Sequence, residues 1–65
     1  MLKYKIDILA ALKEAGYNTN RIRKEKLIGE NSLTAMRNNK PISWATIERV
    51  CDLLKCQPGD ILINE

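Results

Sequence analysis

Apolar residues recur at the spacing of one helix face near both ends of the chain. The first stripe consists of Ile8, Ala11, Leu12 and Ala15. The second stripe consists of Ile47, Val50, Cys51 and Leu54. Positions i, i+3, i+4 and i+7 lie on the same face of an α-helix. The pattern therefore predicts one helix from Asp7 to Ala15, ended by Gly16, and another that is capped by Ser43 and reaches about Lys55.

The segment from Asn18 to about Lys26 predicts a short and unusually polar helix. Asn18 or Thr19 can cap it, because their side-chain oxygens accept hydrogen bonds from the free N–H groups of a first turn. Ile22 is its only apolar residue. A helix with a single apolar anchor is stabilised by its neighbours and turns its charged side outward.

A third short helix is predicted from about Glu30 to Arg37, after a break in the pattern at Leu27–Gly29. Leu33 and Met36 lie one turn apart and are expected to face inward. The residues expected to remain outside are Glu30, Asn31, Thr34, Ala35 and Arg37. The helix ends in a turn at Asn38–Pro41, because Asn tolerates a left-handed backbone and Pro cannot continue a helix.

The last nine residues contain a second turn, Gln57–Asp60, followed by the apolar run Ile61–Ile63. This run is too short for one assignment: it fits a helical turn on the core and it fits a short strand. If it is a strand, Leu2 and Tyr4 near the other terminus are candidates for its partner.

Together these patterns predict one all-α domain over residues 1–65, a compact bundle of four to five short helices with optional short extended termini. The predicted core consists of Leu9, Leu12, Ile22, Leu33, Met36, Ile47, Val50 and Leu54. Cys51 is expected to join it, because free cysteines are usually buried. A chain of this length buries only about 60% of its unfolded surface, so the core is small.

The residue inventory argues against an enzyme, a metal site and a cofactor. The chain has no His, which removes imidazole bases and His ligands. Its two cysteines, Cys51 and Cys56, are too few for a structural zinc site and lack the C-x-x-C spacing of a redox motif. No apolar run is long enough for a membrane span, and no signal peptide is evident at the start. We therefore expect a cytoplasmic protein with reduced thiols.

Positive charge is concentrated in the first part of the sequence. Residues 1–40 carry nine basic and four acidic side chains, whereas residues 41–65 carry two basic and four acidic ones. This asymmetry fits a polyanionic partner for the first part. Ordinary solvated charge explains it equally well.

The order of the predicted elements resembles the Cro/C1-type (XRE-family) helix-turn-helix of phage and bacterial DNA-binding proteins. The resemblance runs from about Lys5 to Leu62 and is most specific at Ser32–Lys40, which looks like the second half of the recognition helix and its following loop. Cys56–Leu62 resembles the end of small family members. The resemblance implies a lambda-repressor-like fold. It also implies a sequence-specific transcriptional regulator that binds double-stranded DNA as a dimer and reads the major groove with its third helix.

The sequence departs from the family pattern around the turn. Arg23 stands where the family usually has Ala, Lys26 where it has an apolar or small residue, and Leu27 where it has Gly. Gly29 stands where Ser or Thr normally caps the recognition helix. One arrangement that accommodates these changes has a longer second helix, with Gly29 supplying the permissive backbone of the turn.

The outward residues of the third helix are candidate base contacts. Asn31 can form a two-bond pair with adenine, and Arg37 can do so with guanine. Thr34 and Ala35 can contact a thymine methyl group, and Glu30 can accept from cytosine while repelling phosphates. Two alternatives stay open: Asn31 as the helix cap, and Arg37 as a solvated or phosphate-bound cation.

Phosphate contacts are implied by the resemblance at the start of the second helix and in the loop after the third. The matching residues are Asn18, Thr19, Asn38, Asn39 and Lys40. Ser43 and the N–H groups opening the fourth helix can add an anion site. Arg21 and Lys24 can reach the DNA backbone from the polar side of the second helix, or form an ordinary solvated face.

A homodimer, at least on DNA, is expected because one short helix reads too few base pairs to select a site in a genome. The candidate contact residues are Trp44, Ile61, Leu62 and Ile63. Two alternatives stay open: Trp44 as a cover for the core, and the tail as part of the monomer core. The rival function is a protein-interaction module of the same fold, such as an antitoxin, an anti-repressor or an inhibitor.

Overall fold

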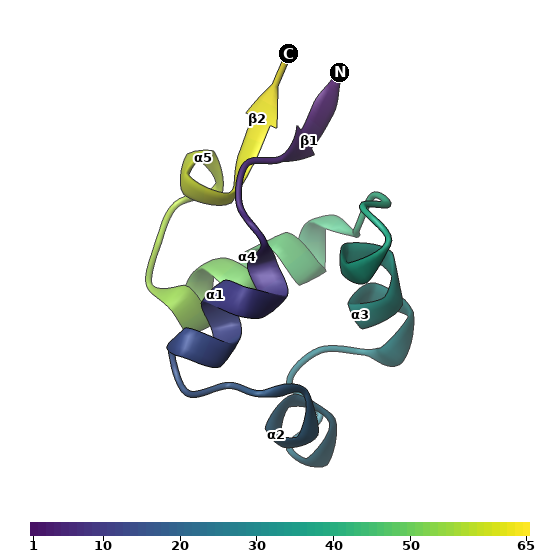
Figure 1. Ribbon diagram of the computed structural model, residues 1–65, viewed down its shortest axis with the longest axis vertical. Helices are drawn as coiled ribbons and strands as arrows, with labels where there is room; N and C mark the ends of the chain where they lie inside the picture. Colours follow the sequence, from purple (N-terminus) through teal and green to yellow (C-terminus); the bar gives the residue numbers. More distant parts are fainter.

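Residues 1–65 are all described by a computed structural model, in which five short helices and a two-stranded sheet surround one apolar core. Their order is β1 (Leu2–Tyr4), α1 (Ile8–Glu14), α2 (Thr19–Lys24), α3 (Glu30–Arg37), α4 (Trp44–Leu54), α5 (Pro58–Ile61) and β2 (Leu62–Asn64). The sheet and both termini lie at one end of the molecule, and α2 lies at the other (Figure 1). The predicted all-α bundle with a helix-turn-helix is confirmed.

Helices α1, α2 and α4 begin where their capping side chains predict. Asp7 accepts from Ala10 N at 3.1 Å at the start of α1. Asn18, and not Thr19, caps α2, and Ser43 caps α4 by accepting from Thr46 N at 3.2 Å. Each cap satisfies an N–H group that has no partner within its helix.

The turn between α2 and α3 differs from the predicted arrangement. Helix α2 ends at Lys24, two residues earlier than expected, and Lys26 adopts the left-handed backbone with φ 53°. Gly29 has an ordinary φ of −68° and starts α3 without a side-chain cap. The hypothesis of a longer second helix with Gly29 as the permissive residue is therefore wrong.

The C-terminal segment combines both assignments that its sequence left open. The expected turn at Gln57–Asp60 is part of a short helix, because Pro58 occupies its first position and Asp60 accepts from Gln57 N at 2.9 Å. Ile61 ends α5, and the chain then continues as β2. Strand β2 pairs antiparallel with β1, which confirms the partner strand predicted near the N-terminus.

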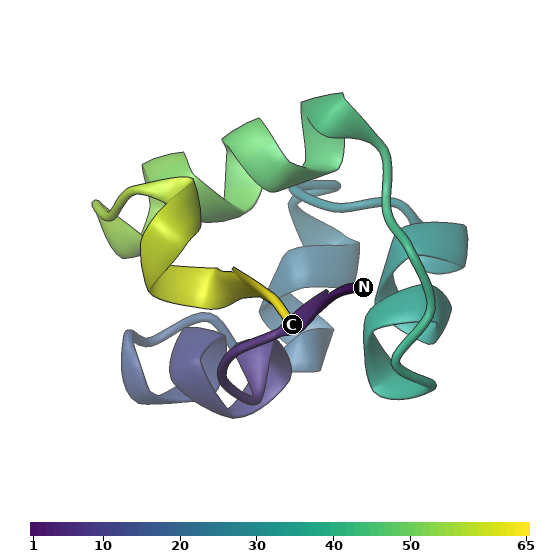
Figure 2. The ribbon, with the colours of Figure 1, turned by 90° about the horizontal axis from the view of Figure 1, so that it is seen from above.

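The core contains eight buried residues and is closed by α1, α3 and α4, with α1 packing against the other two. Figure 2 shows α1 and α4 on opposite sides of the molecule, with α3 at one end. The buried residues are Ile8, Leu12, Ile22, Ile28, Leu33, Met36, Val50 and Ile61. Five of the eight predicted core residues are among them. A separate finding is that the structure has no helix with the length and apolar character of a membrane span.

The remaining predicted core residues, Leu9, Ile47 and Leu54, are only partly buried and pack against this core. Their places are taken by Ile8, Ile28 and Ile61, which enter the core from the first turn of α1, the α2–α3 turn and α5.

Cys51 is also only partly buried, and it is a free thiol like Cys56. Burial raises the pKa of the Cys51 thiol, and the neighbouring Cys56 raises it further. At neutral pH Cys51 therefore stays protonated, which makes it a weak nucleophile.

Leu12→Ala is expected to destabilise the fold by about 2–5 kcal/mol, because Leu12 is fully buried and the substitution leaves a cavity. Leu2→Ala removes the same atoms from a residue that is 64% exposed, so it serves as the matched control. Urea unfolding of both variants below the concentration of any self-association provides the measurement. Equal midpoints for the two variants would contradict the core assignment.

Tyr4→Phe is expected to cost about 0.5–1.5 kcal/mol, because the Tyr4 hydroxyl donates to the Lys40 carbonyl at 2.6 Å and ties β1 to the α3–α4 loop. Burial raises the pKa of Tyr4 above its ordinary value of 10.0. The hydroxyl's contribution is then fully present below pH 10 and is lost as the pH rises through the raised value. Unfolding free energies of wild type and variant should therefore differ at pH 7 and converge in strong alkali. A constant difference would show that the hydroxyl proton is not involved.

Candidate nucleic-acid interface

Helix α3 presents one polar stripe to solvent. Its inward residues Leu33 and Met36 are buried, as predicted. The exposed residues of the stripe are Glu30, Asn31, Thr34 and Arg37. These positions are spaced at i, i+1, i+4 and i+7, so their side chains follow one side of the helix. The stripe offers amide, hydroxyl, carboxylate and guanidinium groups in a row, a set able to address both base edges and phosphates.

Ala35 does not belong to this stripe. It is partly buried, and its carbonyl accepts from Lys40 N at 2.7 Å where the chain turns back after α3. Ala35, which was expected to face outward, is thus only partly exposed. Asn31 is exposed and does not cap the helix, since α3 begins one residue after Gly29.

An ion pair connects the two helices of the motif. Arg23 Nε lies 2.5 Å from Glu30 Oε1, and both side chains are exposed. Arg23, which stands where the resemblance leads one to expect Ala, is thus exposed and paired with the first residue of α3. An exposed pair of this kind contributes only about 0–1 kcal/mol, but it offsets the negative charge of Glu30 beside the stripe.

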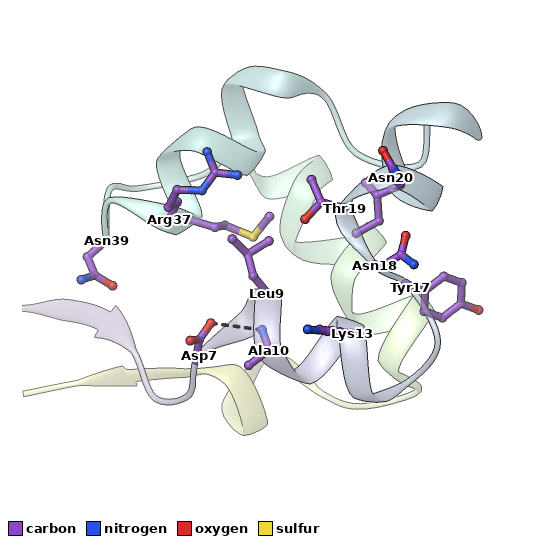
Figure 3. Close-up of a pocket in the computed structure, with 12 residues that line it drawn as sticks. Asp7, Leu9, Ala10, Lys13, Tyr17, Asn18, Thr19, Asn20, Arg37 and Asn39 are labelled. Carbon is purple, nitrogen blue, oxygen red and sulfur yellow. Dashed lines mark hydrogen bonds between the residues drawn. The ribbon is translucent and has the colours of Figure 1, made fainter.

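An open cleft of about 650 Å³ lies beside the stripe, between α1, the start of α2 and the end of α3. Figure 3 shows Arg37 and Asn39 on one side of it, and Asn18, Thr19 and Asn20 on the other. Four predicted contact residues therefore line one cleft: Asn18, Thr19, Arg37 and Asn39. Residues distant in sequence are brought together here by the helix-turn-helix.

Lys13 and Asn20 also line this cleft and were not predicted as site residues. Lys13 lies in the last turn of α1, and nothing in its local sequence sets it apart from a solvated lysine. Lys13 and Arg37 are the basic side chains of the cleft. Its acidic side chain, Asp7, is engaged as the cap of α1. The cleft is thus suited to an anionic group.

The exposed guanidinium of Arg21 is engaged by other residues of the same chain. Its Nε lies 2.6 Å from Glu25 Oε2, and its Nη1 donates to the Gly16 carbonyl at 3.0 Å. Its guanidinium also stacks over the Tyr17 ring at 4.7 Å from the centroid. These contacts join the end of α1 to α2, so the geometry favours a structural role for Arg21 over a phosphate contact.

The loop after α3 exposes Asn38, Asn39 and Lys40 in the left-handed turn that the sequence predicted, with Asn39 at φ 57°. Beyond it, a chain of hydroxyl groups joins α3 to α4. Ser32 Oγ lies 3.0 Å from Thr46 Oγ1, which lies 2.9 Å from Ser43 Oγ. The Ser43 hydroxyl is therefore occupied in capping α4 and positioning α3.

The four candidate dimer residues occupy different environments. Trp44 is 87% exposed, so the interpretation that it covers the core is wrong. Ile61 is fully buried and has no surface for a contact between subunits, so this tail residue belongs to the monomer core. Leu62 and Ile63 are partly buried in β2.

No group of three or more potential metal-ligating side chains lies close together.

Comparison with known families agrees with this geometry. The profile of the Cro/C1-type helix-turn-helix DNA-binding domain matches residues 5–65, which include all five helices. No curated protein and no solved structure matches significantly. The match covers nearly the whole chain, and the chain therefore belongs to the family of Cro/C1-type helix-turn-helix DNA-binding domains.

Proposed function

We propose that the protein is a cytoplasmic, sequence-specific transcriptional regulator that inserts α3 into the major groove and binds its operator as a dimer. The observation that carries this proposal is the exposed stripe of α3 beside a cleft with two basic side chains, in a chain of this family. An α-helix fits the major groove, where every base pair presents a distinct pattern of donors and acceptors.

The side chains divide into base readers and phosphate contacts. Asn31 and Thr34 are the proposed base readers, because both are exposed on α3. Arg37 stands at the end of the stripe and lines the cleft, so it can serve either a guanine or a phosphate. Glu30 reads cytosine only in competition with its ion pair to Arg23.

The proposed phosphate contacts surround the cleft and the loop after α3. They are Asn18, Thr19, Asn38, Asn39 and Lys40. Lys13 is added to them because it lines the same cleft. Contacts of this kind fix the position of a protein on the duplex and carry no sequence information. The hydroxyl chain between Ser32 and Ser43 supports α3 from behind, so that the stripe keeps its direction.

The overall test is a mobility shift against random duplexes at two salt concentrations, followed by selection of the bound sequences. A DNA-binding regulator loses affinity as salt rises and enriches a defined site. Salt-independent retention of a protein partner, with no shift of any duplex, would favour the protein-interaction module instead. That outcome would fit the ion pairs of Arg21 with Glu25 and of Arg23 with Glu30, which offset two positive charges of α2 within the protein.

Asn31→Ala is expected to weaken binding to the selected site by about 1–3 kcal/mol and to relax base choice at one position. The reason is the loss of a two-bond contact from an exposed residue, so stability should stay unchanged. Binding of the variant to the selected site and to the same site altered at each position provides the measurement. An unchanged preference at every position would remove Asn31 from the readout.

Lys40→Ala is expected to weaken binding to all sequences about equally and to reduce the salt slope by roughly one. The matched control is Arg49→Ala, which removes an exposed cation from α4 and should leave the slope unchanged. Affinities measured over a salt series on the selected site and on random DNA separate the two variants. Identical slopes for both would show that Lys40 does not contact a phosphate.

A further inference from the structure

Strand β1 pairs with β2 along one edge, and its outer edge has no strand beside it. Lys5 directs its N–H toward β2, where it donates to the Ile61 carbonyl at 2.8 Å, and Lys3 pairs with β2 in the same way. Successive residues of a strand direct their backbone groups to opposite edges. Leu2 and Tyr4 therefore direct their N–H and C=O groups to the outer edge of β1.

The outer edge of β1 borders an apolar groove of about 500 Å³. Figure 1 and Figure 2 show β1 on the side of the sheet that faces the loop after α3. The Tyr4 hydroxyl donates to the Lys40 carbonyl at 2.6 Å, so the two walls are tied together in advance. The apolar side chains that line the groove are Met1, Leu2, Tyr4, Ile42, Ile47 and Leu62. Met1 and Leu2 are 91% and 64% exposed, so the groove is open to solvent.

The side chains of β1 alternate between apolar and basic. Leu2 and Tyr4 lie on one face of the sheet with Leu62, the cross-strand partner of Tyr4, and all three line the groove. Lys3 and Lys5 lie on the other face and are exposed. A strand added to the outer edge would thus meet apolar neighbours on one face and basic neighbours on the other.

The charged side chains that line the groove, Lys3 and Lys40, are both basic. Lys40 and the nearby Lys5 take no part in an ion pair of this chain. Lys3 Nζ lies 2.9 Å from Glu65 Oε2, but both side chains are more than half exposed, and such a pair contributes only about 0–1 kcal/mol. The groove is therefore complementary to a negatively charged partner.

These lysines disfavour a second copy of this chain as the occupant. Two copies joined through β1 would bring Lys3 and Lys5 of one strand beside those of the other, and like charges on neighbouring strands are destabilising. Lysine on an edge strand is one means by which proteins prevent such pairing. Strand β2 carries no carboxylate, and Glu65 after it is already paired with Lys3. The matching strand must come from a different protein.

We propose that the outer edge of β1 binds an extended segment of a partner protein in which apolar and acidic residues alternate. The segment adds a third, antiparallel strand to the sheet. Its apolar side chains enter the groove beside Ile42 and Ile47, and its carboxylates lie beside Lys3 and Lys5. In this mode of recognition the backbone hydrogen bonds supply affinity, and the alternating side chains supply selectivity.

Occupation of the groove would compete with DNA. Asn39 and Lys40 line the groove and are also proposed phosphate contacts. An acidic segment beside Lys40 offsets its positive charge and repels phosphates, so the partner would release the regulator from its operator. This competition rests on the proposed function, whereas binding of the segment does not.

Fluorescence anisotropy with a labelled synthetic peptide tests the binding. The peptide alternates valine and glutamate over about six residues, the usual length of a strand. It should bind the wild type, and Lys3→Glu should weaken it about tenfold, because an attraction between neighbouring strands becomes a repulsion. The same variant should strengthen binding of a control peptide with lysine in place of glutamate.

Arg49→Glu is the matched control variant. It makes the same change of charge on an exposed residue that does not line the groove, so it should bind the glutamate peptide like wild type. Thermal unfolding checks that both variants are folded. The docking site is overturned if the wild type does not bind the glutamate peptide, or if Lys3→Glu and Arg49→Glu bind it equally well.

N-methylated peptides separate strand pairing from the attraction of charges alone. In an antiparallel third strand the valines direct their N–H groups to β1, and the glutamates direct theirs to solvent. Methylation of the valine nitrogens should therefore abolish binding, and methylation of the glutamate nitrogens should retain it. Equal binding of the two methylated peptides would overturn the paired strand.

A labelled duplex that carries the selected site separates this proposal from the proposed function. The glutamate peptide should displace the duplex from the wild type, and the valine-methylated peptide of the same charge should not. A protein that binds the peptide and no duplex would refute the regulator and support the docking site. A protein that binds the duplex and no peptide would refute the docking site and support the regulator. Peptide binding without displacement would overturn the competition.

Discussion

The architecture depends on one repeated backbone device, the left-handed residue that closes the end of each of the first four helices. Gly16, Lys26, Asn39 and Lys55 all have positive φ. In each case the next residue donates its N–H to a carbonyl five positions back, as Leu27 N does to Ile22 O at 3.0 Å. This pattern satisfies carbonyls that a helix end leaves unpaired and turns the chain sharply. These sharp turns bring the short helices back onto one core of eight residues.

The turn of the helix-turn-helix shows what this device costs and what offsets it. A left-handed conformation at a residue with a Cβ atom is disfavoured by roughly 1–2 kcal/mol, and Lys26 takes it where a glycine would be free of that strain. The compensation lies in the next two residues: Leu27 packs against the core and Ile28 is buried in it. Burial of a side chain such as Ile28 contributes about 1.5–3 kcal/mol. The direction of α3 relative to α2 is thus set by these two apolar residues, and the polar character of α2 does not disturb it.

Local patterns were sufficient for the elements with periodic apolar faces and insufficient where a position depends on distant segments. The boundaries of α3 and the caps at Asn18 and Ser43 could be predicted because each depends on nearby residues. Lys26 and Lys55 could not, because lysine carries no signal for a left-handed backbone. The sequence left Ile61 open between the monomer core and a subunit contact, and α5 turns it into the core. The cleft beside α3 forms only when α1, the start of α2 and the end of α3 are packed together. No local pattern in the sequence therefore marked Lys13 as a residue of this cleft.

One short connection joins the polar stripe of α3 to the start of α4. Ser32 on α3 is linked through Thr46 to Ser43, the residue immediately before Trp44. Lys40, in the loop between the two helices, donates its N–H to the Ala35 carbonyl at the end of α3 and accepts from the Tyr4 hydroxyl of β1 at its own carbonyl. Hydrogen bonds therefore tie the end of α3 to the start of α4 across the loop that connects them. In a two-fold dimer, the separation of the two reading helices is then fixed by the subunit contact. DNA would then be selected by half-site spacing as well as by base sequence, because a wrong spacing could be bound only by breaking the subunit contact or bending the duplex.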